Sequence, residues 1–378
     1  MEYRNVNKEE YPQLKSFFES FYGSNYCEME VHFYNWLHHE NPIRPGFASE
    51  NEYTSFAAFD KKEIITCINY VPIDFYVKGQ KYPACWSVGW LTRDGYPGVA
   101  GFLLKKHFKK FHFYMSMGAT QWVKTIYTTQ FGFEYQHNIG RSIMVGGLPE
   151  KLLQLLKRNQ ELQLSDFQRI YEWAEKTKEI ASKSDFVFIR NFSDLRGKYW
   201  SDHLKRCRAT VAKDQTYMKW RYFEHPHIDY DIISGTSEQD EGIAILRKEE
   251  VRDSSEMIIR MVEFLPTMGN EKKLAGIVAR YLMENRGLFL DFFCGSRPFL
   301  KEYLKCPFIQ PEEHHPFLFP RMFQPLEWRE RYSINASFCE NRKKHQPPFD
   351  IHLEEVYFTK GDPSQDIVLN REYVTRGL

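Results

Sequence analysis

The sequence has almost no excess of charge of either sign. It holds 51 lysines and arginines against 50 aspartates and glutamates, for a formal net charge of +1, and no block of basic residues. Proteins that bind nucleic acid usually concentrate positive charge on one surface, so we expect no nucleic-acid partner. No apolar run approaches the roughly 20 residues that a membrane-spanning helix needs, so we expect no membrane insertion.

Paired cysteines are also lacking. The seven cysteines are scattered and form no Cys-x-x-Cys motif, which excludes the common zinc-ribbon and redox motifs. The neighbouring histidines His38-His39 and His225-Pro226-His227 have no third ligand at a suitable spacing, and we predict no metal. The polar residues 1–5 do not resemble a secretory signal. We therefore expect a cytoplasmic protein with reduced thiols in its core.

The chain is rich in residues that form a core. Of its 378 residues, 42% are hydrophobic and 16% aromatic, which argues against disorder. The apolar spacing predicts helices at 9–22, at 31–39, from 99 onward, at 120–129 and within 148–183, and strands at 54–59, 64–71, 73–77, 84–91 and 111–117. Helices follow several antiparallel strands in this order, which predicts a mixed α/β fold.

The second half of the sequence repeats the first. Trp36-x-x-x-Glu40-Asn41-Pro42 in the first half recurs in the second as Trp220-x-x-x-Glu224-His225-Pro226. The segments 99–103, 112–117 and 132–133 recur as 274–278, 287–292 and 307–308. These three recurrences share one spacing, which is close to the spacing between the two tryptophan motifs. Four matches in order at nearly constant spacing indicate a duplicated unit of domain size.

The repeats suggest a division of the chain into four parts. We predict an N-terminal domain at 1–147, a charged helical connector at 148–195, a C-terminal domain at 196–345, and a C-terminal strand and tail at 346–378. The connector carries an apolar stripe on its helices, so we expect it to pack on the body of the protein.

A glycine-rich turn stands out between a predicted strand and a predicted helix. Asp94-Gly95 and Pro97-Gly98 carry turn chemistry, and helical spacing begins at Val99. Gly95, Gly98 and Gly101 leave the first amides of this helix uncovered, and bare amides at a helix N-terminus attract anions. The turn could hold a pyrophosphate, and an ordinary strand-to-helix turn is the alternative.

The repeated unit resembles the GNAT superfamily of acyl-coenzyme A-dependent N-acetyltransferases. Over most of residues 1–345, the chain resembles a tandem of two such domains. The family carries an [Arg/Gln]-x-x-Gly-x-[Gly/Ala] turn, which Gly98 and Ala100 match and Gly95 does not. Its Tyr-x-x-x-Gly-Phe element is matched by Gly132-Phe133, but Thr128 stands in the tyrosine position and Tyr127 lies next to it.

The resemblance implies two tandem GNAT-like domains, each a mixed, largely antiparallel sheet flanked by helices, with acetyl coenzyme A as co-substrate. An amine attacks the thioester, and the coenzyme leaves as a thiolate. A backbone N–H at the end of the strand would stabilise the oxyanion. The residues expected to bind the coenzyme are Leu91, Thr92, Gly95, Tyr96, Gly98, Val99, Ala100 and Gly101.

Four side chains are candidates for catalysis. Tyr127 would protonate the leaving thiolate, and His137 or Glu134 would serve as the base for the amine. Asp291 is a charge within an apolar strand and would hold the substrate amine from the second domain. The alternatives are an aromatic residue packed on the sheet, a surface histidine, a solvated carboxylate and a strand-end carboxylate.

The second copy of the turn lacks the features of the first. At the spacing that relates the segments 99–103 and 274–278, Asn270, Lys273 and Pro266 replace Gly95, Gly98 and Leu91. A lysine would block the approach to phosphate, and proline has no N–H to donate. We therefore expect only the N-terminal domain to bind coenzyme, with the degenerate C-terminal domain on the substrate side.

These observations favour an N-acyltransferase that acts on a small-molecule amine, such as an amino sugar of surface polysaccharide. A transferase directed at an aminoacyl group or a peptide is the second enzymatic possibility, although a tRNA substrate fits poorly with the balanced charge. A tandem-GNAT binding or scaffold protein without catalysis is the alternative class. The acyl chain, the acceptor and the oligomeric state stay open.

Overall fold

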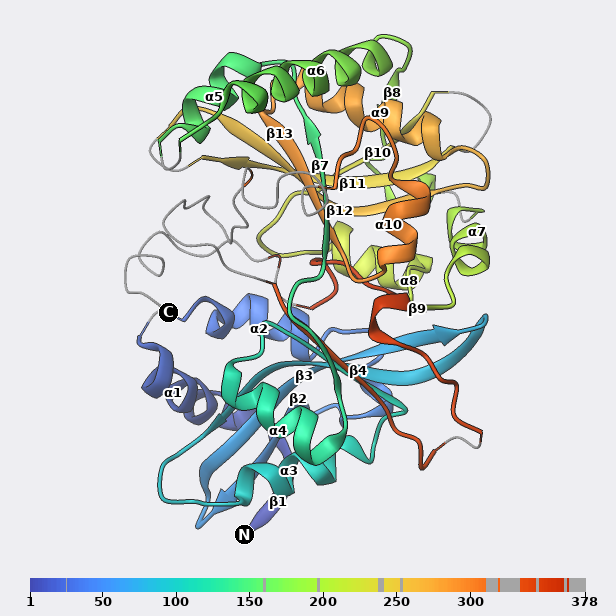
Figure 1. The fold of residues 1–378 in the computed structure, drawn as a ribbon. Coiled ribbons are helices and arrows are strands. Elements are labelled where there is room, and N and C mark those ends of the chain that lie inside the picture. Colours follow the sequence, from blue (N-terminus) through green and yellow to red (C-terminus); the bar gives the residue numbers. More distant parts are fainter. Residues whose placement is uncertain are drawn as a thin grey trace.

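The structure is a computed structural model with two β-sheets, one above the other in Figure 1. It describes residues 1–378 except 25, 159–160, 196–197, 237–240, 252–253, 311–318, 320–333, 345–346, 364–365 and 367–378. Within this described part, every helix is too short or too polar to span a bilayer.

The first sheet is built mainly from the N-terminal part of the chain. Its main path runs, in spatial order, through β1 (Glu2–Asn7), β2 (Glu52–Asp60), β3 (Glu63–Val77), β4 (Gln80–Thr92), β5 (Phe113–Met117), β14 (Ala336–Glu340) and β6 (Glu134–Gln136). Only β4 and β5 are parallel on this path. The far end of β3 also pairs with β9 (Ala209–Val211), and β9 pairs with β15 (Val356–Tyr357).

Helices cover both faces of the first sheet. Phe17 and Phe18 of α1 (Tyr11–Tyr22) pack with Ala57 and Phe59 of β2, whereas Leu103 of α3 and Tyr127 of α4 pack on the opposite side with Phe56 and Ala58. The bounds are α2 (Val31–His38), α3 (Val99–Phe108) and α4 (Gln121–Phe131). Thr120 caps α4, because its hydroxyl accepts from the Val123 N–H.

The second sheet lies above the first. Its order is β7 (Gly140–Val145), β13 (Phe289–Cys294), β12 (Met257–Pro266), β11 (Gly242–Glu250), β10 (Asp231–Gly235) and β8 (Phe186–Phe188). The remaining helices are α5 (Pro149–Leu156), α6 (Leu164–Ala181), α7 (Lys198–Arg206), α8 (Gln215–Met218), α9 (Glu271–Glu284) and α10 (Arg297–Tyr303). The predicted connector is thus two helices, and α5 and α6 pack on the second sheet through a leucine-rich core.

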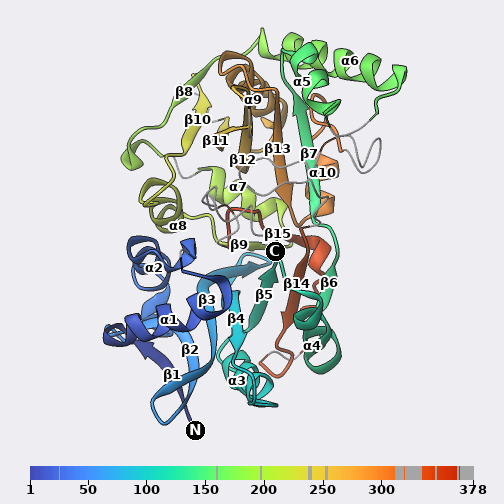
Figure 2. The same cartoon turned by 90° about the vertical axis from the view of Figure 1, so that its left-hand side faces the viewer.

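The two sheets exchange strands. Figure 2 shows β7 leaving the first sheet to lie beside β13, and β14 returning to lie between β5 and β6. Each arriving strand is antiparallel to the strand that it joins. The predicted boundaries at 147 and 196–345 therefore do not follow the sheets, because each sheet is completed by a strand from the other part of the chain. Alternating hydrophobicity identifies a strand but not its partner.

Both sheets open between their parallel strands. In the first, Tyr70 faces Ser87 and Asn69 faces Gly89, so Val88 is an extra residue that bulges out of β4. The pairing of β4 with β5 stops at Ser87–Ser116. The second sheet repeats this arrangement: Val262 is the extra residue of β12, and the pairing with β13 stops at Met261–Phe292. We call these openings the first gap and the second gap.

The repeated tryptophan motif lies where the two halves meet. Trp36 and Trp220 stack with ring centroids 5.1 Å apart, and each indole N–H donates to the backbone carbonyl of the other residue at 3.0 Å. Asn41 and His225 also play the same local role. Asn41 accepts from the Ile43 N–H, and His225 accepts from the His227 N–H, two residues on in each case. The two copies of the motif thus form a two-fold-like contact.

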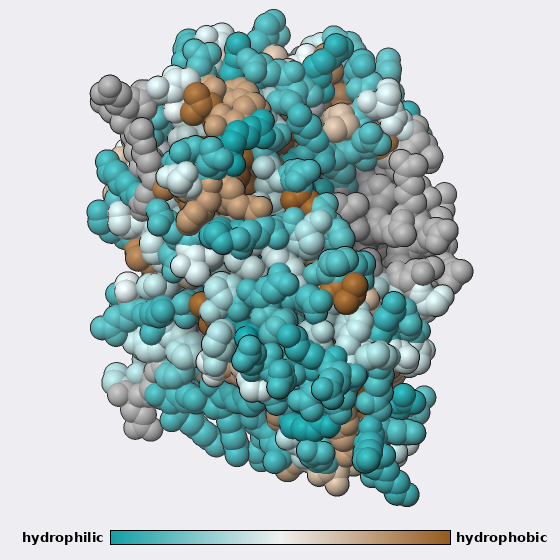
Figure 3. Space-filling model, turned by 180° about the vertical axis from the view of Figure 1, so that it is seen from behind, coloured by the Kyte–Doolittle hydropathy of each residue, from teal (hydrophilic) through white to brown (hydrophobic). Residues whose placement is uncertain are grey.

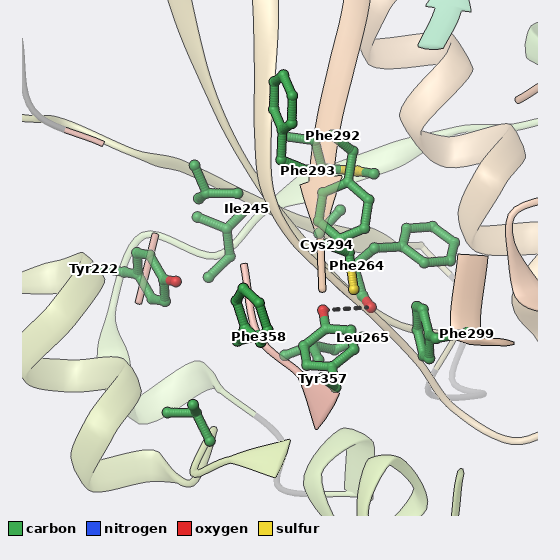
Figure 4. Close-up of a cluster of buried hydrophobic side chains, with 14 of the residues drawn as sticks. Tyr222, Ile245, Phe264, Leu265, Phe292, Phe293, Cys294, Phe299, Tyr357 and Phe358 are labelled. Atoms are coloured by element: carbon green, nitrogen blue, oxygen red, sulfur yellow. Dashed lines mark hydrogen bonds between the residues drawn. The ribbon is translucent and has the colours of Figure 1, made fainter. Parts of the chain in front are cut away.

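The second gap is filled by the chain itself. Figure 4 shows Tyr357 and Phe358 between strands β12 and β13, surrounded by other aromatic and aliphatic side chains. The Gly295 N–H donates to the Phe358 carbonyl at 2.8 Å, and Thr359 pairs with Cys294. The Tyr357 hydroxyl donates to the Phe264 carbonyl at 3.5 Å, drawn as a dashed line. The C-terminal segment therefore supplies the partners that the separated strands lack.

Apolar surface is limited on the face seen from behind. Figure 3 shows that hydrophilic residues dominate there and that hydrophobic residues form small patches, mostly over the half that contains the second sheet. Small exposed patches of this kind are normal for a folded protein, and they do not define a partner surface.

Replacing Phe358 with alanine should lower the free energy of unfolding by about 3–5 kcal/mol. Its ring is fully buried in the second gap, and its loss would leave a cavity where β12 and β13 are no longer paired with each other. Urea denaturation measures the change. Trp122→Ala is the matched control, because Trp122 is 81% exposed, and it should change the free energy by less than about 0.5 kcal/mol. Equal effects of the two variants would contradict the filling role of Phe358.

Candidate active site

The glycine-rich turn lies at the open end of the first gap. Strand β4 ends at Thr92 and α3 begins at Val99. Gly95 and Gly98 have φ angles of +85° and +78°, which favour glycine, and a Cβ added at either would meet nothing within 4 Å. Among the described residues, no acceptor is found for the N–H groups of Ala100 and Gly101. The backbone here is open, and binding of an anion at this turn stays a prediction.

A groove runs from this turn between α3 and α4. It has a volume of about 1070 Å³ and is lined by Gly98, Ala100 and Gly101 at one end. Four cationic side chains line it as well: Lys105, Lys109, Arg342 and Lys343. Its acidic residues, Glu134 and Glu340, accept hydrogen bonds from neighbouring backbone or side-chain groups. The groove is thus a positively charged extension of a helix N-terminus, which suits a ligand with several phosphates.

Tyr127 lies at the level where β4 and β5 separate. Its ring is buried and stacks on Phe133 at 4.4 Å and on Trp90 at 6.0 Å. Ser87 and Ser116, the last pair of residues before the first gap, lie near the Tyr127 hydroxyl. Burial raises the pKa of Tyr127 to about 12, and the neighbouring Ser87 and Ser116 act in the opposite direction. The phenol therefore keeps its proton at neutral pH.

The other two candidates from the first half have other surroundings. The Glu134 carboxylate accepts from the Leu353 N–H at 2.8 Å and bonds with His352 Nδ1 at 2.9 Å, so it holds the turn that leads to β15. His137 is exposed just after β6. The structure brings neither residue into contact with Tyr127, and the role of each as a base stays a prediction.

Asp291 is the centre of a buried ion-pair cluster in the second sheet. Its Oδ2 accepts from Arg141 at 3.0 Å and from Arg260 at 2.6 Å. Burial alone would raise the pKa of Asp291, but Arg260 and Arg141 lower it below its usual value. Arg141 arrives on the exchanged strand β7, so the pair joins the two parts of the chain. We correct the expectation that Asp291 holds a substrate amine, because its carboxylate is fully buried and already paired.

The corresponding turn of the second sheet is closed by the protein itself. Only four residues separate β12 from α9. Asp202 accepts from the Met268 N–H at 2.9 Å, and Glu271 accepts from the Gly269 N–H at 3.2 Å. Arg206 pairs with Glu271 and donates to the Thr267 carbonyl. Carboxylates of the chain thus occupy the positions at which an anionic ligand would bind.

Several residues of the site gave no signal in the sequence. Ser87 and Ser116 are ordinary serines within strands, and only the pairing of β4 with β5 places them beside Tyr127. Arg342 and Lys343 reach the groove because β14 is exchanged between the sheets. No group of three potential metal ligands is found among the described residues.

The similarities to known proteins concern the fold. No protein-family model and no curated protein sequence matches the chain. A GCN5-related N-acetyltransferase from Anabaena variabilis has a TM-score of 0.50 at 11% identity, over 89% of this chain and 72% of that chain. One from Kribbella flavida has a TM-score of 0.50 at 8% identity, over 77% of this chain and 64% of that chain.

A third solved structure, a conserved protein of unknown function from Enterococcus faecalis, has a TM-score of 0.47 at 12% identity, over 77% of this chain and 64% of that chain. The chain thus spans less than two thirds of the length of the Kribbella and Enterococcus structures. At these identities, the similarity is one of fold. The chain has the fold of the GCN5-related N-acetyltransferases.

Replacing Asp291 with asparagine should lower the free energy of unfolding by about 3–5 kcal/mol at pH 7, because two buried arginines lose their shared carboxylate. The folded-state pKa of Asp291 is depressed, so its contribution is present above the unfolded pKa of about 4 and is lost as the pH falls through the folded value. The variant and the wild type should therefore converge in urea denaturation as the pH falls below about 4.

The exposed pair Glu179–Lys183 provides the control for this variant. Glu179→Gln should leave the free energy of unfolding nearly unchanged both at pH 7 and below pH 4. An Asp291→Asn variant that unfolds at the wild-type urea concentration would show that Asp291 is not a structural ion-pair centre.

Proposed function

We propose that the chain is an N-acyltransferase that moves an acetyl or other short acyl group from coenzyme A to a primary amine. One observation carries the proposal: the open amides at the head of α3 continue into a positively charged groove, and α3 follows β4, whose pairing with β5 ends at the first gap. The fold of GCN5-related N-acetyltransferases supports the same reaction class.

The residues present fit a coenzyme A thioester. The turn at Gly95–Gly101 would hold the diphosphate through backbone amides, and Lys105, Lys109, Arg342 or Lys343 would neutralise the remaining phosphate. The edge of β4 beyond Ser87 is not paired with β5, so it would align the thioester arm and direct an N–H near Leu91 or Thr92 at the acyl oxygen. The bound thioester supplies the activated acyl group.

The remaining residues would act around that group. Tyr127 would hold a proton for the departing sulfur, and its burial against Trp90 and Phe133 keeps water away. The general base is open between Glu134, His137 and solvent. The acceptor would approach from the side that faces the second sheet, and a small amine such as an amino sugar is our first choice. A peptide or aminoacyl acceptor is the second.

We also propose that the chain arose as a tandem of two GNAT-like domains, of which only the first binds coenzyme. The reciprocal Trp36–Trp220 contact, the matching bulges at Val88 and Val262, and the matching order of elements support this view. The filled second gap and the closed second turn support a structural role for the later half. Cytoplasmic location stays a prediction.

A binding or scaffold protein without catalysis is the alternative, and the departures at Gly95 and Thr128 favour it. A transferase must bind coenzyme at the glycine-rich turn, whereas a scaffold would bind it there only if it has kept the ligand. Release of free thiol from acetyl coenzyme A, measured over a panel of amino sugars and amino acids, distinguishes them: turnover supports the transferase, and binding without turnover supports the scaffold.

Replacing Gly98 with glutamate should weaken coenzyme binding by at least about tenfold, or ~1.4 kcal/mol, because a carboxylate would stand where the diphosphate binds. Ligand that binds only the native state raises the melting temperature in proportion to its excess. Acetyl coenzyme A should therefore raise the melting temperature of the wild type and leave that of Gly98→Glu almost unchanged.

Gly79→Glu is the matched control. Gly79 lies in the β3–β4 hairpin with the same φ of +78° and the same open surroundings, so the substitution introduces the same backbone strain and charge away from the site. It should bind coenzyme as the wild type does. Wild-type binding by Gly98→Glu, or equal losses in both variants, would refute the assignment of the turn.

A further inference from the structure

A buried amide beside the first gap has no hydrogen-bond partner for its nitrogen among the described residues. The amide belongs to Asn69 of β3, which is 1% exposed. Asn69 pairs with Gly89 of β4, the residue that follows the bulge at Val88. A buried amide donor in this state costs free energy, and most such donors in folded proteins are paired. The position therefore indicates an acceptor atom that a ligand brings.

The neighbours of Asn69 decide which end of its amide is turned toward β4. The Tyr34 hydroxyl donates to Asn69 Oδ1 at 3.0 Å, and the Cys67 thiol donates to the same oxygen at 3.7 Å. Burial raises the pKa of both groups, so each keeps its proton and needs an acceptor. The amide orientation is assigned from these two hydrogen bonds. Ser55 bonds with the Tyr34 hydroxyl in turn, and the oxygen of Asn69 is thus fixed on the side of α2.

The glycine at position 89 leaves the nitrogen uncovered on the side of the gap. A Cβ added at Gly89 would lie 3.9 Å from Asn69 Nδ2 and 3.3 Å from Phe18 Cε1, so a side chain here would crowd Phe18 and cover the amide. The pairing of β4 with β5 has already ended at Ser87, and Gly89 is partly exposed. The Nδ2 group thus lies beside a bare part of β4 that borders the opening.

Asn69 lies on the face of the first sheet that is turned toward the second half of the chain. Successive residues of a strand point to opposite faces. Ile68 and Tyr70 pack on one face, in the core that contains α3 and α4, whereas Val71 packs on the other, in the core shared with the second half. Because α3 begins at the turn that would hold the coenzyme, Asn69 faces the side from which the acyl acceptor would approach.

We propose that Asn69 is a specificity-determining residue that donates a hydrogen bond from Nδ2 to a hydroxyl of the acyl acceptor, on the carbon next to the one that carries the reacting amine. This inference rests on the proposed function and narrows its substrate class to vicinal amino alcohols. Many amino sugars contain this unit. A simple alkyl amine offers no atom for the hydrogen bond.

The chemistry of the amide decides which atom it can hold. Its N–H groups donate and cannot accept, so they bind an oxygen and leave the lone pair of the amine free to attack the thioester. The oxygen must be close to the amine, because Asn69 borders the opening at which the thioester would be attacked. The groups packed around the amide, Tyr34, Ser55 and Cys67, are neutral. A neutral surrounding favours a hydroxyl over a carboxylate, since a buried charge needs a partner.

Thiol release from acetyl coenzyme A, measured with ethanolamine and with propylamine, tests the proposal. The two amines have the same size and differ in a hydroxyl against a methyl group. The ratio of their kcat/KM values, ethanolamine over propylamine, should fall about tenfold in Asn69→Leu, the equivalent of one hydrogen bond. The intrinsic reactivities of the amines cancel when this ratio is compared between enzymes. A smaller folded fraction lowers both rates alike, so the ratio reports recognition and not stability.

Asn5→Leu is the matched control. Asn5 is also a buried asparagine, but it lies on the edge strand β1, and its Nδ2 donates to the Phe47 carbonyl at 3.0 Å. Its replacement should lower stability and keep the wild-type ratio. Asn69→Ala is a second variant at the site and should lower the ratio as Asn69→Leu does. Free glycine, which carries a carboxylate at the position of the hydroxyl, is the third acceptor: dependence on Asn69 with glycine alone would overturn the assignment of a hydroxyl.

The outcomes separate this inference from the proposed function. A wild type that neither binds acetyl coenzyme A nor releases thiol would overturn both. A wild type that binds coenzyme and does not turn over ethanolamine would overturn the inference alone. The same holds for a ratio that is unchanged in Asn69→Leu and Asn69→Ala, or that falls equally in Asn5→Leu. A lower melting temperature with an unchanged ratio would assign Asn69 to stability.

Discussion

Two parallel strands that separate within a protein core leave backbone groups that must find partners. A single extra residue in β4 and another in β12 start this separation in the two sheets. Unpaired backbone N–H and C=O groups are costly in a dry interior. Each opening must therefore be filled by groups that can form hydrogen bonds with the separated strands. In the second sheet, the chain's own C-terminal segment fills it. In the first, the open turn and the charged groove adjoin the opening, and we propose that an external thioester fills it.

This constraint explains why two similar halves would have different roles. The second turn is short, and Asp202, Arg206 and Glu271 saturate its polar groups. The first turn is longer, and its glycines keep the surroundings empty. Buried ion pairs hold the half of the chain whose opening is filled. Lys213 is buried between Glu263 and Asp362, and Asp291 pairs with two arginines. Such paired charges tolerate little displacement.

Local sequence signals predicted much of the fold. The helices α1 to α4, the β2–β3 hairpin and the glycine turn follow from residue spacing and turn chemistry, which act over a few residues. The tryptophan motif marked a real contact, because Trp36 and Trp220 meet. The edge strand β1 gave a weak pattern and was missed, and strands 64–71 and 73–77 are one strand, β3, which continues through Pro72.

The rest depended on contacts between distant segments. Periodicity cannot show that β7 and β14 change sheets, so the exchange of strands and the arrival of Arg342 at the groove were out of reach. Asp291 was misjudged because a lone carboxylate in an apolar strand indicates a partner or a function without saying which. The serines near Tyr127 were invisible for a related reason: a serine in a strand becomes informative only when its neighbours across the sheet are known.

Strand exchange also affects how the molecule is made. During synthesis, the first sheet cannot be completed when the chain up to Gly147 has left the ribosome, because β14, which belongs between β5 and β6, is translated only after β8 to β13. Many multidomain chains fold their N-terminal domain early. Here β5 and β6 of the nascent first half lack the strand between them until β14 has been synthesised. The first sheet can therefore be completed only after the strands of the second sheet have been synthesised.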